Sequence, residues 1–213
     1  MQSGGLVKEE IVKRARVVNY TPFENTQRET KFHMTNKKVI TVFGSSACRP
    51  GDEDYALAER LGGALARAGY IVCNGGYMGT MEASAKGAKE AGGEAIGITV
   101  ETFTNRTANP FLTQEHRQPD LHSRIEKLIS LADAYVILPG GIGTLAELFV
   151  VWNLVVMKNI PPRPILLLGN LYDQLLRTLQ ELTEVEQNHL AFLKVVYSVE
   201  EIVENLKEHL RKQ

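Results

Sequence analysis

The segment Pro139-Gly140-Gly141-Ile142-Gly143-Thr144 has the composition of a phosphate-binding loop. It follows the apolar run 134–138 and precedes a long apolar segment, so we expect it to join a buried strand to a helix. Glycines let backbone N–H groups approach an anion, and a helix N-terminus carries a partial positive charge. The alternative is a tight turn whose glycines serve packing alone. The predicted phosphate ligands are Gly140, Gly141, Gly143 and Thr144.

Glu147 is a candidate catalytic carboxylate. It lies three residues after Thr144, and Thr-x-x-Glu is also the pattern of a capping box, in which the glutamate only satisfies a backbone donor. Glu147 is, however, the sole charged residue between Asp133 and Lys158, on a segment that is otherwise apolar. A carboxylate in such surroundings, beside a phosphate site, is a candidate functional group. Both interpretations are open at this point.

Arg124 is the candidate partner of this carboxylate. It lies early in the helical stretch that precedes the strand 134–138, so its side chain can point towards the same crevice, and Lys127 one turn further on shares its face. The alternative is a solvated arginine, as on most amphipathic helices. His122 and the other four histidines show no spacing suited to a metal site, so we predict none.

Two other glycine-containing turns follow apolar runs. Gly44-Ser45-Ser46 follows the run 39–43, and the turn 74–80, Asn-Gly-Gly-Tyr-Met-Gly-Thr, follows the run 70–73. Parallel α/β sheets bind ligands beyond the carboxyl ends of their strands. We therefore expect all three turns to converge at one edge of a sheet around a phosphate or sugar. The further candidate binding residues are Gly44, Ser45, Gly75, Gly76, Met78 and Gly79.

The rest of the chain alternates short apolar runs with helical stretches, which predicts right-handed βαβ units and a parallel sheet covered on both faces. The expected fold class is α/β, a Rossmann-like doubly wound parallel sheet in a single domain spanning residues 37–213. Residues 1–36 are predicted to be an N-terminal extension, and residues 101–120 a long polar loop. The predicted strands are 39–43, 70–73, 95–100, 134–138, 164–168 and 195–197, and the predicted helices include 81–91, 145–157, 171–182 and one starting at residue 199.

The helix predicted over 145–157 is apolar nearly all round and carries Trp152. A helix of this kind is either central in its domain or packed against another subunit.

The composition narrows the function classes. With 44% hydrophobic and 23% charged residues, a chain of 213 residues suits one folded domain. A net charge of -1 argues against a nucleic-acid partner. No apolar stretch is long enough to span a bilayer, and only Cys48 and Cys73 are present. We expect a cytoplasmic protein with no membrane partner.

The segment 139–147, Pro-Gly-Gly-Ile-Gly-Thr-Leu-Ala-Glu, resembles the PGGxGTxxE signature of the Lonely Guy (LOG) family, formerly labelled lysine decarboxylases. The turn 74–81 is similar to the family's second glycine motif, and Phe43-Gly44-Ser45-Ser46 to its first-strand turn; the similarity covers about residues 37–170. It implies a homodimer that hydrolyses the N-glycosidic bond of a nucleoside 5′-monophosphate, releasing base and ribose 5-phosphate. Cytokinin ribotides are the best-known substrates.

The same resemblance implies roles for individual residues. The family's catalytic arginine and glutamate match Arg124 and Glu147. Glu147 would stabilise oxocarbenium character or orient the attacking water, and Arg124 would assist the leaving base or anchor the ribotide electrostatically. No cofactor is implied for this reaction. The family often has lysine where this chain has Ile125, and glutamate where it has Ala146.

Two other functions are compatible with the glycine loops. A carrier of a nucleotide-like cofactor, such as molybdenum cofactor, would bind without turnover and would not need Arg124 and Glu147 as a pair. A nucleotide sensor would use the same crevice as a switch.

Overall fold

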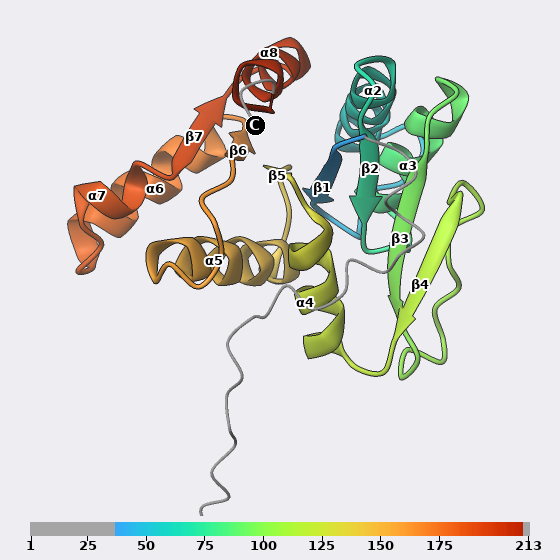
Figure 1. Cartoon of the computed structure of the whole chain (residues 1–213), viewed down its shortest axis with the longest axis horizontal. Helices are drawn as coiled ribbons and strands as arrows, with labels where there is room; N and C mark the ends of the chain where they lie inside the picture. Colours follow the sequence, from blue (N-terminus) through green and yellow to red (C-terminus); the bar gives the residue numbers. More distant parts are fainter. Residues whose placement is uncertain (1–36, 211–213) are drawn as a thin grey trace, which may run out of the picture.

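The computed structural model describes residues 37–210 and centres on one parallel sheet (Figure 1). The sheet has seven strands in the order β4-β3-β2-β1-β5-β6-β7, and all neighbouring strands run parallel. This arrangement confirms the predicted α/β doubly wound fold. The strands are β1 (Val39–Phe43), β2 (Ile71–Asn74), β3 (Ala95–Val100), β4 (Gln114–Gln118), β5 (Ala134–Ile137), β6 (Ile165–Leu168) and β7 (Leu193–Val196).

Helices cover both faces of the sheet because alternate residues of each buried strand point to opposite sides. Ile40 and Val42 of β1 face the core formed with α2 and α8, whereas Val39 and Phe43 face the core formed with α4 and α5. The helices are α2 (Glu53–Arg67), α3 (Thr80–Glu90), α4 (Leu121–Leu131), α5 (Ile142–Val156), α6 (Leu171–Leu182), α7 (Gln187–Leu190) and α8 (Val199–Leu210).

The strand order reverses between β1 and β5. These two strands pair with each other, from Ile40 opposite Ala134 to Phe43 opposite Ile137. Chain connections leave β1 towards β2 on one side, while β5 lies on the other. A crevice at the carboxyl ends of the strands is expected at such a switch point. The turn after β1 and the glycine-rich loop after β5 both border it.

The prediction of a loop over residues 101–120 is wrong, because this segment contains β4. β4 pairs with β3 from Ile96↔Gln114 to Val100↔Gln118. Its sequence, Gln-Glu-His-Arg-Gln, contains no aliphatic side chain, and the strand lies at the edge of the sheet with much of its surface exposed. An edge strand with so little to bury leaves no hydrophobic pattern to detect. The single-turn helix α7 was missed as well.

The first turn of α5 differs from the prediction in a way that bears on Glu147. The helix begins at Ile142 rather than Leu145, and its N-cap is Gly141, which offers no side-chain cap. Thr144 therefore lies inside the helix and cannot act as the capping residue. The capping-box interpretation of Thr144 and Glu147 is wrong.

Within residues 37–210, none of the helices is both long and apolar enough to cross a membrane. The N-terminal extension predicted over residues 1–36 lies outside the described residues.

Candidate functional site

The three turns predicted to converge do so. The carbonyl oxygen of Ser45 accepts hydrogen bonds from Thr80 N (2.8 Å) and Thr80 Oγ1 (3.1 Å), which joins the turn after β1 to the turn after β2. A Cβ atom on Gly140 would lie 3.1 Å from Ser45 N, and one on Gly44 would lie 3.0 Å from the Leu138 Cβ. The loop after β5 therefore touches the turn after β1.

The N-terminus of α5 leaves an open cradle at this edge. Gly141 and Gly143 are exposed, and a Cβ on either would meet no atom within 4 Å. Gly140, in contrast, packs against the side chain of Thr144, which is buried. The first backbone N–H groups of a helix have no intrahelical acceptor and favour an anion. The start of α5 is therefore a candidate anion site.

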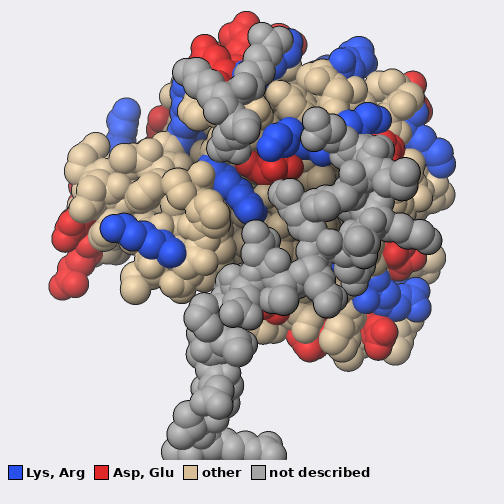
Figure 2. All heavy atoms as spheres, viewed as in Figure 1, with Lys and Arg blue, Asp and Glu red and all other residues tan. Residues whose placement is uncertain are grey.

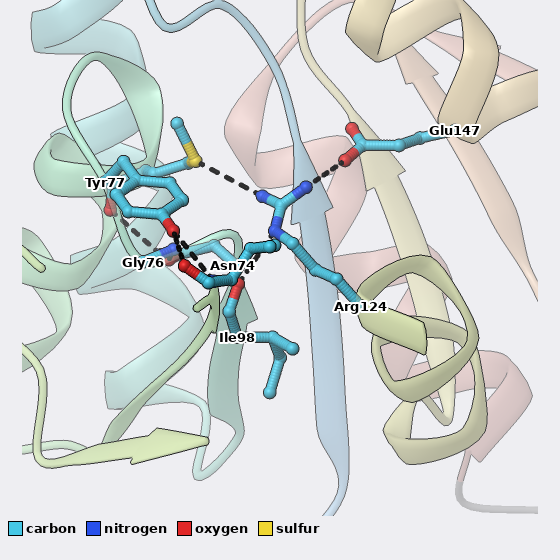
Figure 3. Close-up of polar contacts among 8 residues, drawn as sticks. Asn74, Gly76, Tyr77, Ile98, Arg124 and Glu147 are labelled. Carbon is cyan, nitrogen blue, oxygen red and sulfur yellow. Dashed lines mark hydrogen bonds and ion pairs between the residues drawn. The ribbon is translucent and has the colours of Figure 1, made fainter. Parts of the chain in front are cut away.

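Arg124 is buried, with 7% of its surface exposed, so the alternative of a solvated arginine is wrong. From α4, its Nε donates to the carbonyl oxygen of Ile98 in β3 at 2.8 Å, and its Nη1 lies 3.3 Å from Glu147 Oε1 (Figure 3). Nη2 donates to the sulfur of Met81 at 3.9 Å, and the guanidinium carbon lies 5.9 Å from the ring centre of Tyr77. These contacts fix the guanidinium in one orientation.

Gly75 makes room for this guanidinium. A Cβ at Gly75 would clash with Arg124 Nη2 and would lie 2.6 Å from the sulfur of Met81. Gly76, which has a φ of +78°, is also buried against protein atoms. Gly75 therefore supports the arginine, whereas Gly76 packs against Thr99 and Gly97 of β3.

Asn74 holds the turn that contains these glycines. Its Nδ2 donates to Met81 O at 2.8 Å and to Ser84 Oγ at 3.0 Å, while its Oδ1 accepts from Gly76 N at 2.8 Å. The sequence interpretation missed this role, although asparagine before two glycines is a typical local turn former. The roles of Met81 and of the Ile98 carbonyl had no sequence signal.

The remaining predicted binding residues lie in the turns that follow β1 and β2. Met78 is exposed, and Ser45 is partly exposed. Gly79 caps α3 with a φ of +73° and packs against the backbone of Ser45 and Ser46, so any side chain there would clash.

Burial raises the pKa of Glu147 to about 7, against the lowering effect of the charge and hydrogen bond of Arg124. The cause is the apolar environment of α5, which disfavours the ionised carboxylate. Near neutral pH the group therefore exchanges readily between its two protonation states, which suits a group that reacts.

The spacing between cradle and carboxylate follows from the helix. Glu147 lies four residues after Gly143, on the same side of α5 and about 6 Å further along the axis. If the phosphate of a ligand lies at the first turn of α5, the sugar attached to that phosphate would reach the Arg124–Glu147 pair. The arrangement can bind a phosphorylated sugar and place a carboxylate beside it.

The doubly wound sheet, the glycine-rich helix N-terminus and the buried arginine–glutamate pair define a Rossmann-like protein with a candidate anion site at its switch point. The family model described as "Possible lysine decarboxylase" matches residues 81–206. The chain belongs to this family, the Lonely Guy family.

Relatives and solved structures match the chain to different extents. A cytokinin riboside 5′-monophosphate phosphoribohydrolase of Rhodococcoides fascians is 34% identical over 149 residues, covering 68% of this chain and 75% of that protein. A pyrimidine/purine nucleotide 5′-monophosphate nucleosidase of Escherichia coli K12 is 26% identical over 156 residues, 62% of this chain but only 34% of that protein. The molybdenum cofactor binding protein of Rippkaea orientalis superposes with a TM-score of 0.67 at 23% identity, covering 83% of this chain and 99% of that one. This last likeness concerns the fold alone.

Gly143→Ala tests the cradle. We expect the melting temperature to stay the same or rise, because alanine favours the helix and its methyl group meets no atom within 4 Å. We also expect ribose 5-phosphate to bind at least tenfold more weakly, because the methyl group crowds the first-turn N–H groups. Calorimetry with ribose 5-phosphate measures this, with Asn153→Ala, an exposed position on α5, as the control. Unchanged affinity in Gly143→Ala would place the phosphate elsewhere.

Proposed function

We propose that this protein is a phosphoribohydrolase that cleaves a nucleoside 5′-monophosphate into free base and ribose 5-phosphate. The observation that carries the proposal is the buried ion pair of Arg124 Nη1 and Glu147 Oε1, 3.3 Å apart and one turn from the glycine-rich helix start. The names of the relatives in Rhodococcoides fascians and Escherichia coli, a phosphoribohydrolase and a nucleosidase, support it.

The proposed reaction breaks the bond between C1′ and the base nitrogen and forms a bond from C1′ to a water oxygen. The 5′-phosphate lies on the N–H groups at the start of α5, next to Gly140, Gly141, Gly143 and Thr144. Ionised Glu147 stabilises positive charge at C1′ and orients the water, from which it accepts a proton. Arg124 stabilises the electrons that leave with the base, and the base takes up one proton, which balances the proton that the water gives to Glu147.

A carrier of a nucleotide-like cofactor is less well supported. The structural likeness to the molybdenum cofactor binding protein stands at 23% identity and concerns the fold. A carrier needs the glycine turns but has no use for a buried carboxylate whose pKa is raised to about 7 beside an arginine. We therefore favour the hydrolase.

The experiment that tests the proposal is incubation of the protein with a panel of nucleoside monophosphates, followed by chromatography of the products. We expect at least one member of the panel to release free base, and the matching nucleosides without phosphate to release none. Tight nucleotide binding without base release from any member would favour the carrier.

We further propose that two copies associate through α5. The helix presents apolar side chains to solvent, with Ile142 86% and Val150 38% exposed, and Met157 at its C-terminal cap is 62% exposed. In Figure 2 the lobe that carries α5, α6 and α7 is mostly uncharged, with a basic side chain across its front and acidic side chains at its outer end. Covering such a face is favourable in water. Light scattering at micromolar concentration is expected to give twice the chain mass of 23.7 kDa, and a mass of one chain would contradict the proposal.

The proposed compartment is the cytoplasm. Cys48 and Cys73 are both free thiols and both buried. Free cysteines are common where the environment is reducing.

A further inference from the structure

The turn after β2 forms one wall of the space that holds the Arg124 guanidinium. Figure 3 shows Gly76 and Tyr77 of this turn on one side of the guanidinium and Glu147 on the other. A Cβ atom at Gly75 would clash with Arg124 Nη2, and the ring centre of Tyr77 lies 5.9 Å from the guanidinium carbon. Because Gly75 has no side chain, its backbone packs directly against Nη2. A shift of the turn would therefore change the space that is open to the guanidinium.

Asn109 holds this turn from a segment that is distant in the sequence. It lies between β3 and β4, and only 5% of its surface is exposed. Its Nδ2 donates to the carbonyl oxygen of Tyr77 at 3.1 Å, and its backbone N donates to that of Gly76 at 2.9 Å. Its Oδ1 accepts from Phe111 N at 3.1 Å, which orients the amide. Asn109 therefore provides donors to two consecutive carbonyl oxygens of the turn.

Asn74 and Asn109 hold different atoms of the same turn. Asn74 Oδ1 accepts from Gly76 N at 2.8 Å, whereas Asn109 pairs with the carbonyl oxygens. The bond between Asn109 Nδ2 and the carbonyl oxygen of Tyr77 is buried. A buried carbonyl that loses a donor is unfavourable, so the turn is expected to shift towards another partner when the Asn109 amide is removed. The guanidinium of Arg124 lies in the path of such a shift.

We propose that Asn109 is a positioning residue, which holds the turn after β2 so that Arg124 stays paired with Glu147. The charge and the hydrogen bond of Arg124 lower the pKa of Glu147, while burial raises it to about 7. If the pair loosens, burial acts with less opposition, and the pKa of Glu147 rises further. The ionised fraction of Glu147 near neutral pH then falls. The consequence for hydrolysis rests on the proposed function, whereas the effect on Glu147 itself does not.

Carbon-13 NMR of the Glu147 carboxyl tests this without turnover. The full-length protein is titrated as wild type, Asn109→Ala and Asn109→Ser, and comparison with Glu147→Gln identifies the signal. We expect the pKa of Glu147 to rise by about one unit in Asn109→Ala, which would cut its ionised fraction at pH 7 about fivefold. Asn109→Ser also lacks the Nδ2 donor but keeps a polar group, so it gives the same test if alanine prevents folding.

Asn205→Ala is the matched control. Asn205 on α8 is 8% exposed, and its Nδ2 donates to the carbonyl oxygen of Glu201 at 2.6 Å, so this variant also loses an amide donor to a backbone carbonyl. The helix α8 packs on the face of the sheet opposite α4 and α5. We expect Asn205→Ala to lower the melting temperature about as much as Asn109→Ala and to leave the pKa of Glu147 unchanged.

Two results would overturn the proposal: an unchanged pKa of Glu147 in the folded Asn109 variants, or an equal rise in Asn205→Ala. Activity provides a second measurement. If the wild type hydrolyses a nucleotide, the acid limb of the pH profile of kcat/KM should move to higher pH in Asn109→Ala, and activity should recover as the pH rises. The hydrolase proposal fails separately. A wild type that releases no free base, together with a raised pKa of Glu147 in Asn109→Ala, would refute hydrolysis and leave the role of Asn109 intact.

Discussion

Glu147→Gln is expected to lower the rate of nucleotide hydrolysis by about 10²–10⁴. Glutamine has nearly the same shape and removes only the ability to carry a negative charge and take a proton. The carboxylate is buried against Arg124 and has no capping role, since the N-cap of α5 is Gly141. The measurement is kcat with AMP for the wild-type protein and the variant at pH 8, where most of the wild-type Glu147 is ionised.

Stability provides the control for this substitution. The pKa of Glu147 is raised from 4.5 to about 7 on folding, mainly by burial, so the folded protein binds this proton more tightly than the unfolded chain. The contribution of Glu147 to the free energy of unfolding is therefore present below about pH 4.5 and falls as the pH rises towards 7. Glutamine carries no such proton. We expect the variant to melt no lower than the wild type at pH 8, with the difference shrinking towards pH 5. An active variant that melts well below the wild type would make Glu147 a structural residue.

Arg124→Ala has the second largest expected effect, a loss of about 10²–10³ in kcat/KM for AMP. The guanidinium lowers the pKa of Glu147 by its charge and its hydrogen bond, so without it a larger fraction of Glu147 is protonated at neutral pH. The two residues then act as a unit, and the double variant should lose far less than the product of the two single losses. The wild type, the two single variants and the double variant are compared at one pH.

Lys127→Ala serves as the control for Arg124→Ala, because Lys127 lies on the same helix one turn further on. We expect it to retain most of the activity. Losses that multiply in the Arg124→Ala, Glu147→Gln double variant would show that the two side chains act independently, and would contradict the pair as the catalytic unit.

The layout of the fold could be predicted because its central strands are buried on both faces. Runs such as Val39–Phe43 and Ala134–Ile137 are buried along their whole length and apolar except for Thr41, and glycine turns follow them. The strand β4 could not be predicted, because Gln114–Gln118 pairs through its backbone and buries little. That strand carries Glu115 and Arg117, so the place of these two residues at the edge of the sheet could not be predicted either.

The charged residues of the candidate site could be predicted from the sequence, whereas the contacts that hold Arg124 in place could not. Arg124 and Glu147 were matched through the family resemblance, and the structure brings them together. What holds Arg124 is a backbone carbonyl, a methionine sulfur and the absence of a side chain at Gly75. Such contacts depend on how β2, β3 and α4 meet in space, and residue types along the chain do not encode them locally.

The most direct test of the account is a product balance for AMP with the wild-type protein and with Glu147→Gln. Adenine, ribose 5-phosphate, adenosine and inorganic phosphate are measured in the same reaction. We predict that the wild type forms adenine and ribose 5-phosphate in equal amounts, with neither adenosine nor inorganic phosphate, and that Glu147→Gln forms about 10²–10⁴ times less of both. Adenosine with inorganic phosphate, or full activity in Glu147→Gln, would contradict glycosidic hydrolysis by the Arg124–Glu147 pair.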